Sequence, residues 1–241
     1  MGATVHIWTI GLDTEPATVC SLLELLSGEE RVRAARFRTT ELRLRFIAGR
    51  GALRSILSRY LGVAPAKVRI DTTATGKPFI PGNALAFNLS HSEGVAVCAV
   101  TTGGQLGVDI ERMRRVEDSD SIVQRYFAPG ELKQYEALRP AARTAAFFSA
   151  WTRKEAFVKA LGSGLQRELN SFEVEIAPQA TCPRLLLGAS ESEQTWSLRA
   201  FTPSPQYMAA VALDREIEAL EFFQWSAVAP LAATQPEIGL A

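Results

Sequence analysis

The feature that most constrains the fold of this chain is an order of elements that occurs twice, about one hundred residues apart. A strand, a long helix and several short strands are expected first, and after Gly103-Gly104 a similar order begins again. Both long helices end in two basic residues followed by Leu-Gly, namely Arg54, Arg59, Leu61 and Gly62, then Lys154, Lys159, Leu161 and Gly162. Four matches alone could arise by chance, but with the repeated element order they predict two similar α/β halves.

The boundaries of these halves follow from helix periodicity and from turn residues. Apolar residues at three-four spacing predict a long helix that stops at Gly62, with Pro65 just beyond. Short β-rich runs are separated by Gly/Pro turns. We therefore expect an α+β protein in which residues 1–102 and 103–225 each pack a small sheet on a long helix, followed by a loosely held tail over residues 226–241.

Composition excludes several classes of protein. The 241 residues carry 26 Lys+Arg and 26 Asp+Glu, and 47% are hydrophobic, as in a soluble globular protein with a sizeable core. A net charge of zero argues against a nucleic-acid coat, which needs a positive field. Three scattered cysteines, no signal-peptide pattern and no apolar run of membrane-spanning length predict a cytoplasmic protein with reduced thiols.

Two carboxylates lie two residues apart in the run GVDIE. On a strand, Asp109 and Glu111 point to the same face, about 6.6 Å apart along the chain. Such a pair repels unless it is protonated, bridged by a base or neutralised by a metal such as Mg²⁺. Solvated acids that pair with Arg112 or Arg114 are the alternative at this point.

A second candidate cluster lies on the helix that contains WTRKEAFVK. Glu155 and Lys159 share one helix face, which can be an ordinary surface ion pair. If Glu155 met Asp109 and Glu111, three acids would converge beside Lys154 and Lys159. That mixture of charges suits a metal ion and a phosphate bound together.

The run FNLSHS and the upstream GKPF carry small polar groups and a lysine. Ser90 and His91 are neighbours, but adjacent residues rarely have the geometry of a catalytic triad, and no GxSxG elbow surrounds the serine. Asn, Ser and His side chains suit phosphate oxygens instead. Lys77 does not belong to a Walker A loop, because the GxxxxGK[ST] spacing is missing.

The segment between Gly28 and Gly62 is strongly basic. It holds nine arginines and three glutamates, a local charge of +6. A solvated helix surface is the common reason for such a run. An anionic ligand or an acidic partner is the alternative, because arginine offers forked donors.

Taken in order, GKPF, FNLSHS, GVDIE and WTRKEAFVKALGSGL resemble the 4′-phosphopantetheinyl transferases. The resemblance is to the long, monomeric type that activates carrier proteins of fatty-acid, polyketide and peptide synthesis. It covers about residues 29–165 and extends more faintly to residue 213. The ordered pair of GVDIE and W-x-x-KE-A-x-x-K is its most specific part.

The resemblance implies a fold and a reaction. The fold would be two related halves about a pseudo-twofold axis, with coenzyme A bound between them. The reaction would move the phosphopantetheine arm of coenzyme A to a serine of an apo acyl or peptidyl carrier protein. Adenosine 3′,5′-bisphosphate would leave, with Mg²⁺, or alternatively Mn²⁺, as the metal.

The resemblance also implies a role for each matching residue. Asp109, Glu111 and Glu155 match metal ligands, with Asp109 beside the coenzyme, and Glu155 is the candidate for taking the serine proton. Contacts to coenzyme A match seven further positions: Lys154 and Lys159 at the pyrophosphate, Ser90 and His91 at a phosphate, Lys77 at the adenine end, and Arg33 and Arg45 near the 3′-phosphate. Lys159 would also stabilise the leaving group.

Two positions depart from the family pattern. Glu30 stands where a lysine is frequent, so Arg31 is expected to substitute for it, and Phe46 stands where a hydroxyl residue is frequent. Residues 124–132, with Tyr126 and Phe127, are a candidate surface for the carrier protein, although they can equally be core. A Mg²⁺-dependent phosphohydrolase and a non-catalytic coenzyme A-binding regulator are the alternative functions.

Overall fold

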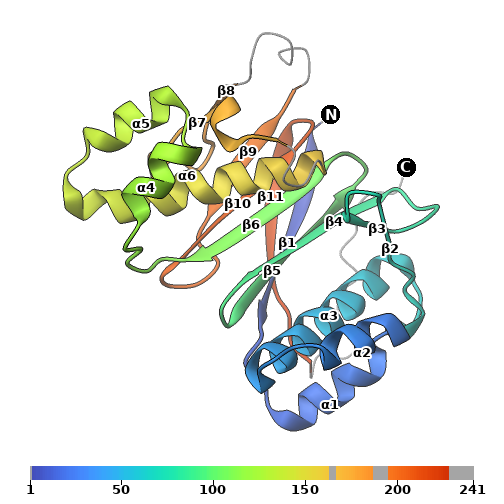
Figure 1. Ribbon diagram of the computed structural model, residues 1–241. Coiled ribbons are helices and arrows are strands. Elements are labelled where there is room, and N and C mark those ends of the chain that lie inside the picture. Colours follow the sequence, from blue (N-terminus) through green and yellow to red (C-terminus); the bar gives the residue numbers. More distant parts are fainter. Residues whose placement is uncertain (1, 163–166, 187–194, 228–241) are drawn as a thin grey trace.

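The computed structural model describes residues 2–162, 167–186 and 195–227, and its architecture is the α+β class that the sequence predicts (Figure 1). The helices are α1 (Pro16–Leu25), α2 (Gly28–Ala35), α3 (Thr40–Leu61), α4 (Ser119–Tyr126), α5 (Pro129–Glu136) and α6 (Pro140–Leu161), with 3₁₀ turns at Pro65–Lys67 and Leu169–Ser171. In the described part of the chain, every helix is too short or too polar to span a bilayer. Most of the tail expected over residues 226–241 lies outside the described residues.

Two sheets form the centre of the protein. The first has the order β11-β1-β5-β4 and the second the order β6-β10-β9. The strands are β1 (Ala3–Gly11), β4 (Leu85–Ser92), β5 (Val95–Thr102), β6 (Leu106–Arg112), β9 (Ser197–Phe201), β10 (Tyr207–Leu213) and β11 (Ile217–Gln224), with short ladders of β2 (Asp71–Thr72) with β3 (Pro78–Phe79) and of β7 (Glu173–Val174) with β8 (Leu185–Leu186).

The last strand returns to the first sheet. β11 pairs in parallel with β1, whereas β1 and β5 pair antiparallel. Residues 217–224 were expected within the C-terminal half, yet they hydrogen-bond the N-terminal sheet. The division at residues 102 and 103 therefore leaves β11 unexplained and stays a prediction for the rest of the chain.

The two long helices correspond closely. α3 and α6 both have 22 residues, and they begin one hundred residues apart. Each ends at a glycine with a left-handed backbone, Gly62 with φ 65° and Gly162 with φ 68°. A residue with a Cβ adopts that conformation at a cost, so glycine is the natural stop. The offset that the sequence predicts is therefore present in the long helices.

Three apolar clusters hold the elements together. Ile56 and Leu57 of α3 pack with Trp8 and Phe87 of the first sheet. α6 lies across β6 and β10 (Figure 1). Its phenylalanines form a second cluster with residues of α4, α5 and β7. The third cluster joins Val5, Ile7 and Val97 of the first sheet to strands of the second, with further members Val108, Ile110 and Val211. This third cluster therefore packs the two halves against each other.

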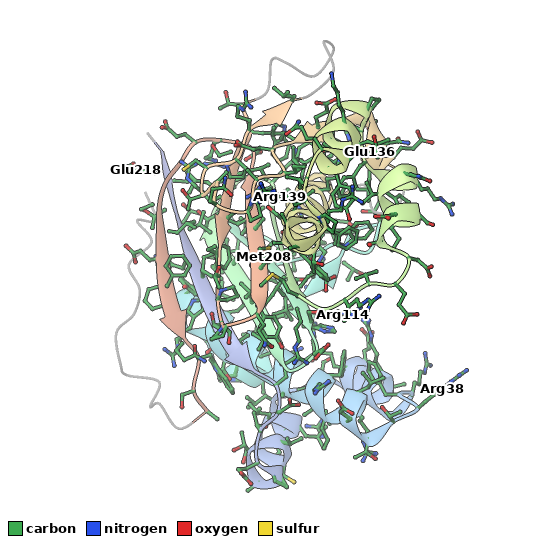
Figure 2. All side chains as sticks on the ribbon, turned by 90° about the vertical axis from the view of Figure 1, so that its left-hand side faces the viewer. Arg38, Arg114, Glu136, Arg139, Met208 and Glu218 are labelled. Atoms are coloured by element: carbon green, nitrogen blue, oxygen red, sulfur yellow. The ribbon has the colours of Figure 1, made fainter. Side chains whose placement is uncertain are left out.

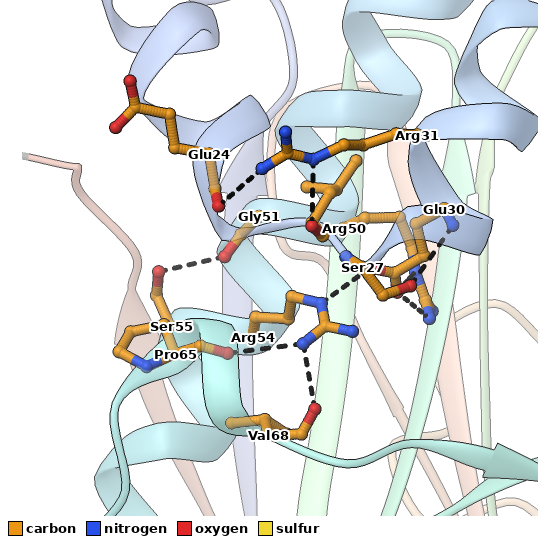
Figure 3. Close-up of polar contacts among 11 residues, drawn as sticks. Glu24, Ser27, Glu30, Arg31, Arg50, Gly51, Arg54, Ser55, Pro65 and Val68 are labelled. Carbon is orange, nitrogen blue, oxygen red and sulfur yellow. Dashed lines mark hydrogen bonds and ion pairs between the residues drawn. The ribbon is translucent and has the colours of Figure 1, made fainter.

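A buried carboxylate anchors the first long helix. Glu30 forms a capping box with Ser27 at the start of α2 and binds Arg50 at 2.5 Å and Arg54 at 2.6 Å (Figure 3). Arg54 also donates to the carbonyl of Val68 at 2.9 Å. Although burial favours its neutral form, the two guanidinium groups lower the pKa of Glu30.

The second half contains a matching arrangement. Glu131 accepts from the backbone N–H of Ala128 at the start of α5 and binds Lys154 of α6 at 2.8 Å. Lys154 is the residue one hundred positions after Arg54. The equivalent bases thus tie each long helix to the acid of a preceding short helix.

We expect Glu30→Ala to lower the free energy of unfolding by about 3 kcal/mol, because it leaves two guanidinium groups without their buried partner. Urea unfolding measures this, with exposed Glu29→Ala as the control. Since the folded-state pKa is the lower one, the loss should shrink as the pH falls below about 4.5, the ordinary value for glutamate. Equal stability of the two variants would contradict the prediction.

Candidate functional site

Polar side chains of β4 connect the two sheets at the place where their edge strands meet. Asn88, Ser90 and Ser92 alternate along β4 and are all buried. Asn88 accepts from the backbone N–H of Val108 at 2.9 Å, and Ser92 accepts from that of Arg112 at 3.1 Å. β4 and β6 belong to different sheets, so these side chains join two edges that have no ladder of their own.

A glycine lets α6 approach β6 closely. A Cβ at Gly107 would collide with the carbonyl of Ala156 and the backbone nitrogen of Ala160. Side chains of α6 therefore reach residues of β6 directly, and Lys159 Nζ lies 2.6 Å from Asp109 Oδ1. The first glycine of GVDIE thus serves the contact between strand and helix.

Asp109 is the most buried acid of this region that the sequence singled out, with 4% exposure. Its Oδ1 accepts from Ser90 Oγ at 2.9 Å and from Lys159, while its Oδ2 is buried with no hydrogen-bond partner. Burial raises the pKa of Asp109, and Lys159 opposes that shift. An orphaned carboxylate oxygen in such surroundings fits a cation ligand.

Glu111 and Glu155 share the negative field of Asp109. Burial raises the pKa of Glu155, and the charges of Asp109 and Glu111 raise it further. Burial and Asp109 likewise raise the pKa of Glu111, whose Oε2 accepts from Ser92 Oγ at 2.8 Å. The three carboxylates are therefore near enough to repel one another.

The described residues contain no group of three His, Cys, Asp or Glu side chains already arranged to hold a metal ion. The donors nevertheless fit a hard divalent cation in their chemistry, since all three are carboxylates and one has the unpartnered oxygen of Asp109. The structure thus brings the three acids near each other without enclosing a metal site.

A cavity of about 620 Å³ opens beside this cluster, between the two halves. It includes Lys77, Glu155 and Lys159. The remaining lining is Thr75, Gly76, Pro78, Asn88, Leu89, Arg125, Tyr126, Val158, Gly162, Arg167, Glu168, Leu169 and Asn170. Lys77 donates to the carbonyl of Ala160 at 2.6 Å, and burial lowers its pKa to about 8.

Three other basic candidates lie outside the lining of this cavity. His91 is exposed, and surrounding protein atoms together with Lys159 and Arg45 lower its pKa. Arg45 binds Asp13 at 2.7 Å and Glu41 at 2.6 Å. Arg33 is exposed, with its guanidinium over the Phe46 ring. His91 thus lies within electrostatic reach of both Lys159 and Arg45, whereas Arg33 contacts an aromatic ring.

Lys154 does not reach the cavity, in contrast to the expected pyrophosphate contact. Its side chain is fully buried, and its ammonium donates to the carbonyls of Leu169 and Phe172 at 2.7 Å each. The third donor serves Glu131. All three ammonium hydrogens are therefore used inside the protein.

Several arginines of the basic segment bind other groups of the protein itself. Arg31, the expected substitute at position 30, donates to the carbonyls of Leu26 and Glu24, and Arg50 and Arg54 bind Glu30 (Figure 3). Arg38, by contrast, extends from the surface (Figure 2). The local charge of +6 consequently overstates what a ligand would meet.

The candidate carrier surface is only partly available. Phe127 is buried with 3% exposure, whereas Tyr126 is half-buried and lines the cavity. Residues 163–165 of the GSGL run lie outside the described residues. The sequence reasoning missed Arg125 as a lining residue and Ser92 as a partner of Glu111, although the alternation of Asn88 with two serines was a usable signal.

Comparison with known proteins identifies the family. Residues 105–212 match the model of the 4′-phosphopantetheinyl transferase superfamily, and residues 13–103 match that of the 4′-phosphopantetheinyl transferase N-terminal region. Similar proteins include the 4′-phosphopantetheinyl transferase HetI of Nostoc sp. (strain PCC 7120), which is 40% identical over 87% of each chain. The chain therefore belongs to the 4′-phosphopantetheinyl transferase superfamily.

Further relatives indicate the type within that family. The 4′-phosphopantetheinyl transferase Sfp of Bacillus subtilis (strain 168) is 30% identical over 78% of this chain and 82% of its own length. AcpT of Salmonella typhi is 36% identical over 63% of this chain and 74% of its own. The chain is of the long, Sfp-like type, and the predicted family is confirmed.

We expect Lys154→Met to reduce the free energy of unfolding by about 3 kcal/mol, because it leaves Glu131 as an unpaired buried carboxylate. Chemical denaturation checks this, with exposed Lys133→Met as the control. The double variant with Glu131→Gln should lose less than the sum of the single losses. Full stability of Lys154→Met would show that the ammonium is not essential to the fold.

Proposed function

We propose that the protein transfers the 4′-phosphopantetheine group of coenzyme A to a serine hydroxyl of an apo carrier protein. The serine oxygen forms a bond to the β-phosphorus, and the pyrophosphate P–O bond to the adenosine part breaks. Adenosine 3′,5′-bisphosphate leaves with the electron pair. The observation that carries this proposal is a cavity in which Glu155 and Lys159 stand beside Asp109, in a chain of this family.

Glu155 is the proposed acceptor of the serine proton, directly or through a water. Burial and the neighbouring acids raise its pKa, so it binds a proton more readily than an exposed glutamate does. It lines the cavity, where a hydroxyl from a partner can approach. These properties support a role for Glu155 as the general base.

The basic residues are proposed to bind the phosphates. Lys159 is 32% exposed, and its ammonium can serve the pyrophosphate and the leaving group while it stays close to Asp109. Lys77 suits the adenine end and His91 the neighbouring phosphate, and Ser90 would have to exchange its hydrogen bond to Asp109 to contact that phosphate. Arg33 and Arg45 remain the proposed 3′-phosphate contacts, and Arg45 would have to exchange its pairing with Asp13.

Asp109, Glu111 and Glu155 are proposed to hold Mg²⁺, with Mn²⁺ as the alternative. When bound, the ion would offset negative charge at the pyrophosphate. The unpartnered Oδ2 of Asp109 supports this assignment. Ser90 and Lys159 meanwhile fix the other oxygen of the same carboxylate.

We further propose that the protein works as a monomer in the cytoplasm. One chain supplies Lys77 from its first half and Glu155 from its second, so the cavity needs no second copy. Acyl and peptidyl carriers are both candidate partners. A panel of apo carriers, each incubated with coenzyme A and Mg²⁺, would identify the preferred one by its gain in mass.

The same assay tests the function. A gain in carrier mass equal to phosphopantetheine supports transfer. Consumption of coenzyme A without that gain would indicate a phosphohydrolase, and binding with neither change a regulator. Treatment with a chelator should stop the transfer, and added Mg²⁺ or Mn²⁺ should restore it.

We expect Asp109→Ala and Glu155→Ala to reduce the rate of carrier modification at least about 100-fold, because one loses the proposed metal ligand and the other also the base. Mass spectrometry of the carrier measures the rate, and circular dichroism checks the fold. Glu136→Ala, an exposed acid on α5, is the control. Full activity of both site variants would contradict the metal assignment.

We expect the KM for coenzyme A to rise above pH 8, by up to about tenfold per pH unit, because Lys77 loses its proton near its lowered pKa of about 8. The charged form, which attracts an anion, is present below that pH. Lys77→Arg should flatten this rise, since a guanidinium keeps its proton. Identical pH profiles of the two proteins would exclude Lys77 as the source.

A further inference from the structure

Ser92 lies at the end of β4 and contacts β6 twice through one hydroxyl. Its Oγ donates to Glu111 Oε2 at 2.8 Å and accepts from the backbone N–H of Arg112 at 3.1 Å. The residue is buried, with 7% exposure. The hydroxyl thus touches both the carboxylate and the backbone that carries the next side chain.

The two contacts fix the direction of the hydroxyl hydrogen. A serine hydroxyl has one hydrogen to donate, and here the Arg112 N–H occupies an acceptor position. The hydrogen is then directed at Glu111. Without this hydrogen bond, the Glu111 side chain would be free to adopt several rotamers. Because Ser92 is buried, water has little access to replace the contact.

Ser90 makes the same kind of contact with Asp109, the other acid of GVDIE. Its Oγ donates to Asp109 Oδ1 at 2.9 Å and accepts from Lys159 Nζ at 2.9 Å. Two serines at alternate positions of β4 therefore hydrogen-bond two carboxylates at alternate positions of β6. Glu111 has no lysine at hydrogen-bonding distance among the described contacts, so Ser92 matters more to it.

We propose that Ser92 is a positioning residue that orients Glu111 toward the cation held with Asp109 and Glu155. This inference rests on the proposed metal site, and it assigns Ser92 no contact with the substrate. Partners that orient metal ligands contribute roughly 10–100-fold to metal affinity. Loss of the hydroxyl should therefore lower the affinity for the metal, while the protein stays folded.

The experiment measures Mn²⁺ binding to the full chain with coenzyme A present, from the electron paramagnetic resonance signal of free Mn²⁺. Ser92→Thr and Ser92→Val have nearly the same shape and differ in the hydroxyl. We expect Ser92→Thr to bind Mn²⁺ within about threefold of wild type, and Ser92→Val and Ser92→Ala to bind about tenfold more weakly. Thermal unfolding of each variant is recorded in parallel.

Ser58→Ala is the matched control for loss of a buried hydroxyl. Ser58 is 2% exposed, and its Oγ donates to the carbonyl of Ser55 at 2.8 Å within α3. We expect this variant to lower the unfolding temperature without a change in Mn²⁺ affinity. A loss of Mn²⁺ affinity equal to that of Ser92→Val would overturn the positioning role.

The outcomes separate this inference from the proposed function. Equal Mn²⁺ affinity of Ser92→Thr and Ser92→Val, with wild type binding normally, would overturn the role of Ser92 alone. If wild type transfers phosphopantetheine but binds no Mn²⁺, the proposed metal site fails and the role of Ser92 fails with it. Weak Mn²⁺ binding by Ser92→Val with normal Mn²⁺ binding by Ser92→Thr supports both the proposed metal site and the role of Ser92.

Discussion

The arrangement of the candidate site depends on the side-chain contacts between β4 and β6. These strands are edges of different sheets, and Asn88, Ser90 and Ser92 join them with hydrogen bonds where a backbone ladder is missing. A backbone ladder would hold the strands but would leave the carboxylates free to turn. Serine hydroxyl groups instead bind the carboxylates themselves. The contacts that join β4 to β6 therefore also orient Asp109 and Glu111.

The two buried acids of the short helices show how a repeated pattern acquires different uses. Glu30 forms an ion pair with Arg54 in the first half, and Glu131 forms one with Lys154 in the second. In both cases the base lies on a long helix and satisfies backbone carbonyls of the following segment. Lys154 therefore resembles Arg54 in role, and its place beside Glu155 in the sequence is no guide to where its ammonium points.

The sequence predicted the fold class and the proximity of three acids, but it did not predict the direction of the basic side chains. Periodicity and glycine stops suffice for α3 and α6, because those signals are local. The return of β11 to the first sheet depends on pairing across two hundred residues, which no local pattern contains. The direction of a long basic side chain likewise depends on which carbonyls and acids lie nearby, as Lys154 and Arg31 show.

Local charge balance would allow the proposed site to bind a cation and a polyanion together. The charge of Asp109 raises the pKa of both Glu111 and Glu155, and Lys159, which lies 2.6 Å from Asp109, lowers the pKa of all three acids. A cation added to this cluster would reduce the demand on Lys159, whose partly exposed ammonium could then attract a phosphate. Each ligand would thus make the site more suitable for the other, and a chain with no net charge can provide this as well as a basic one.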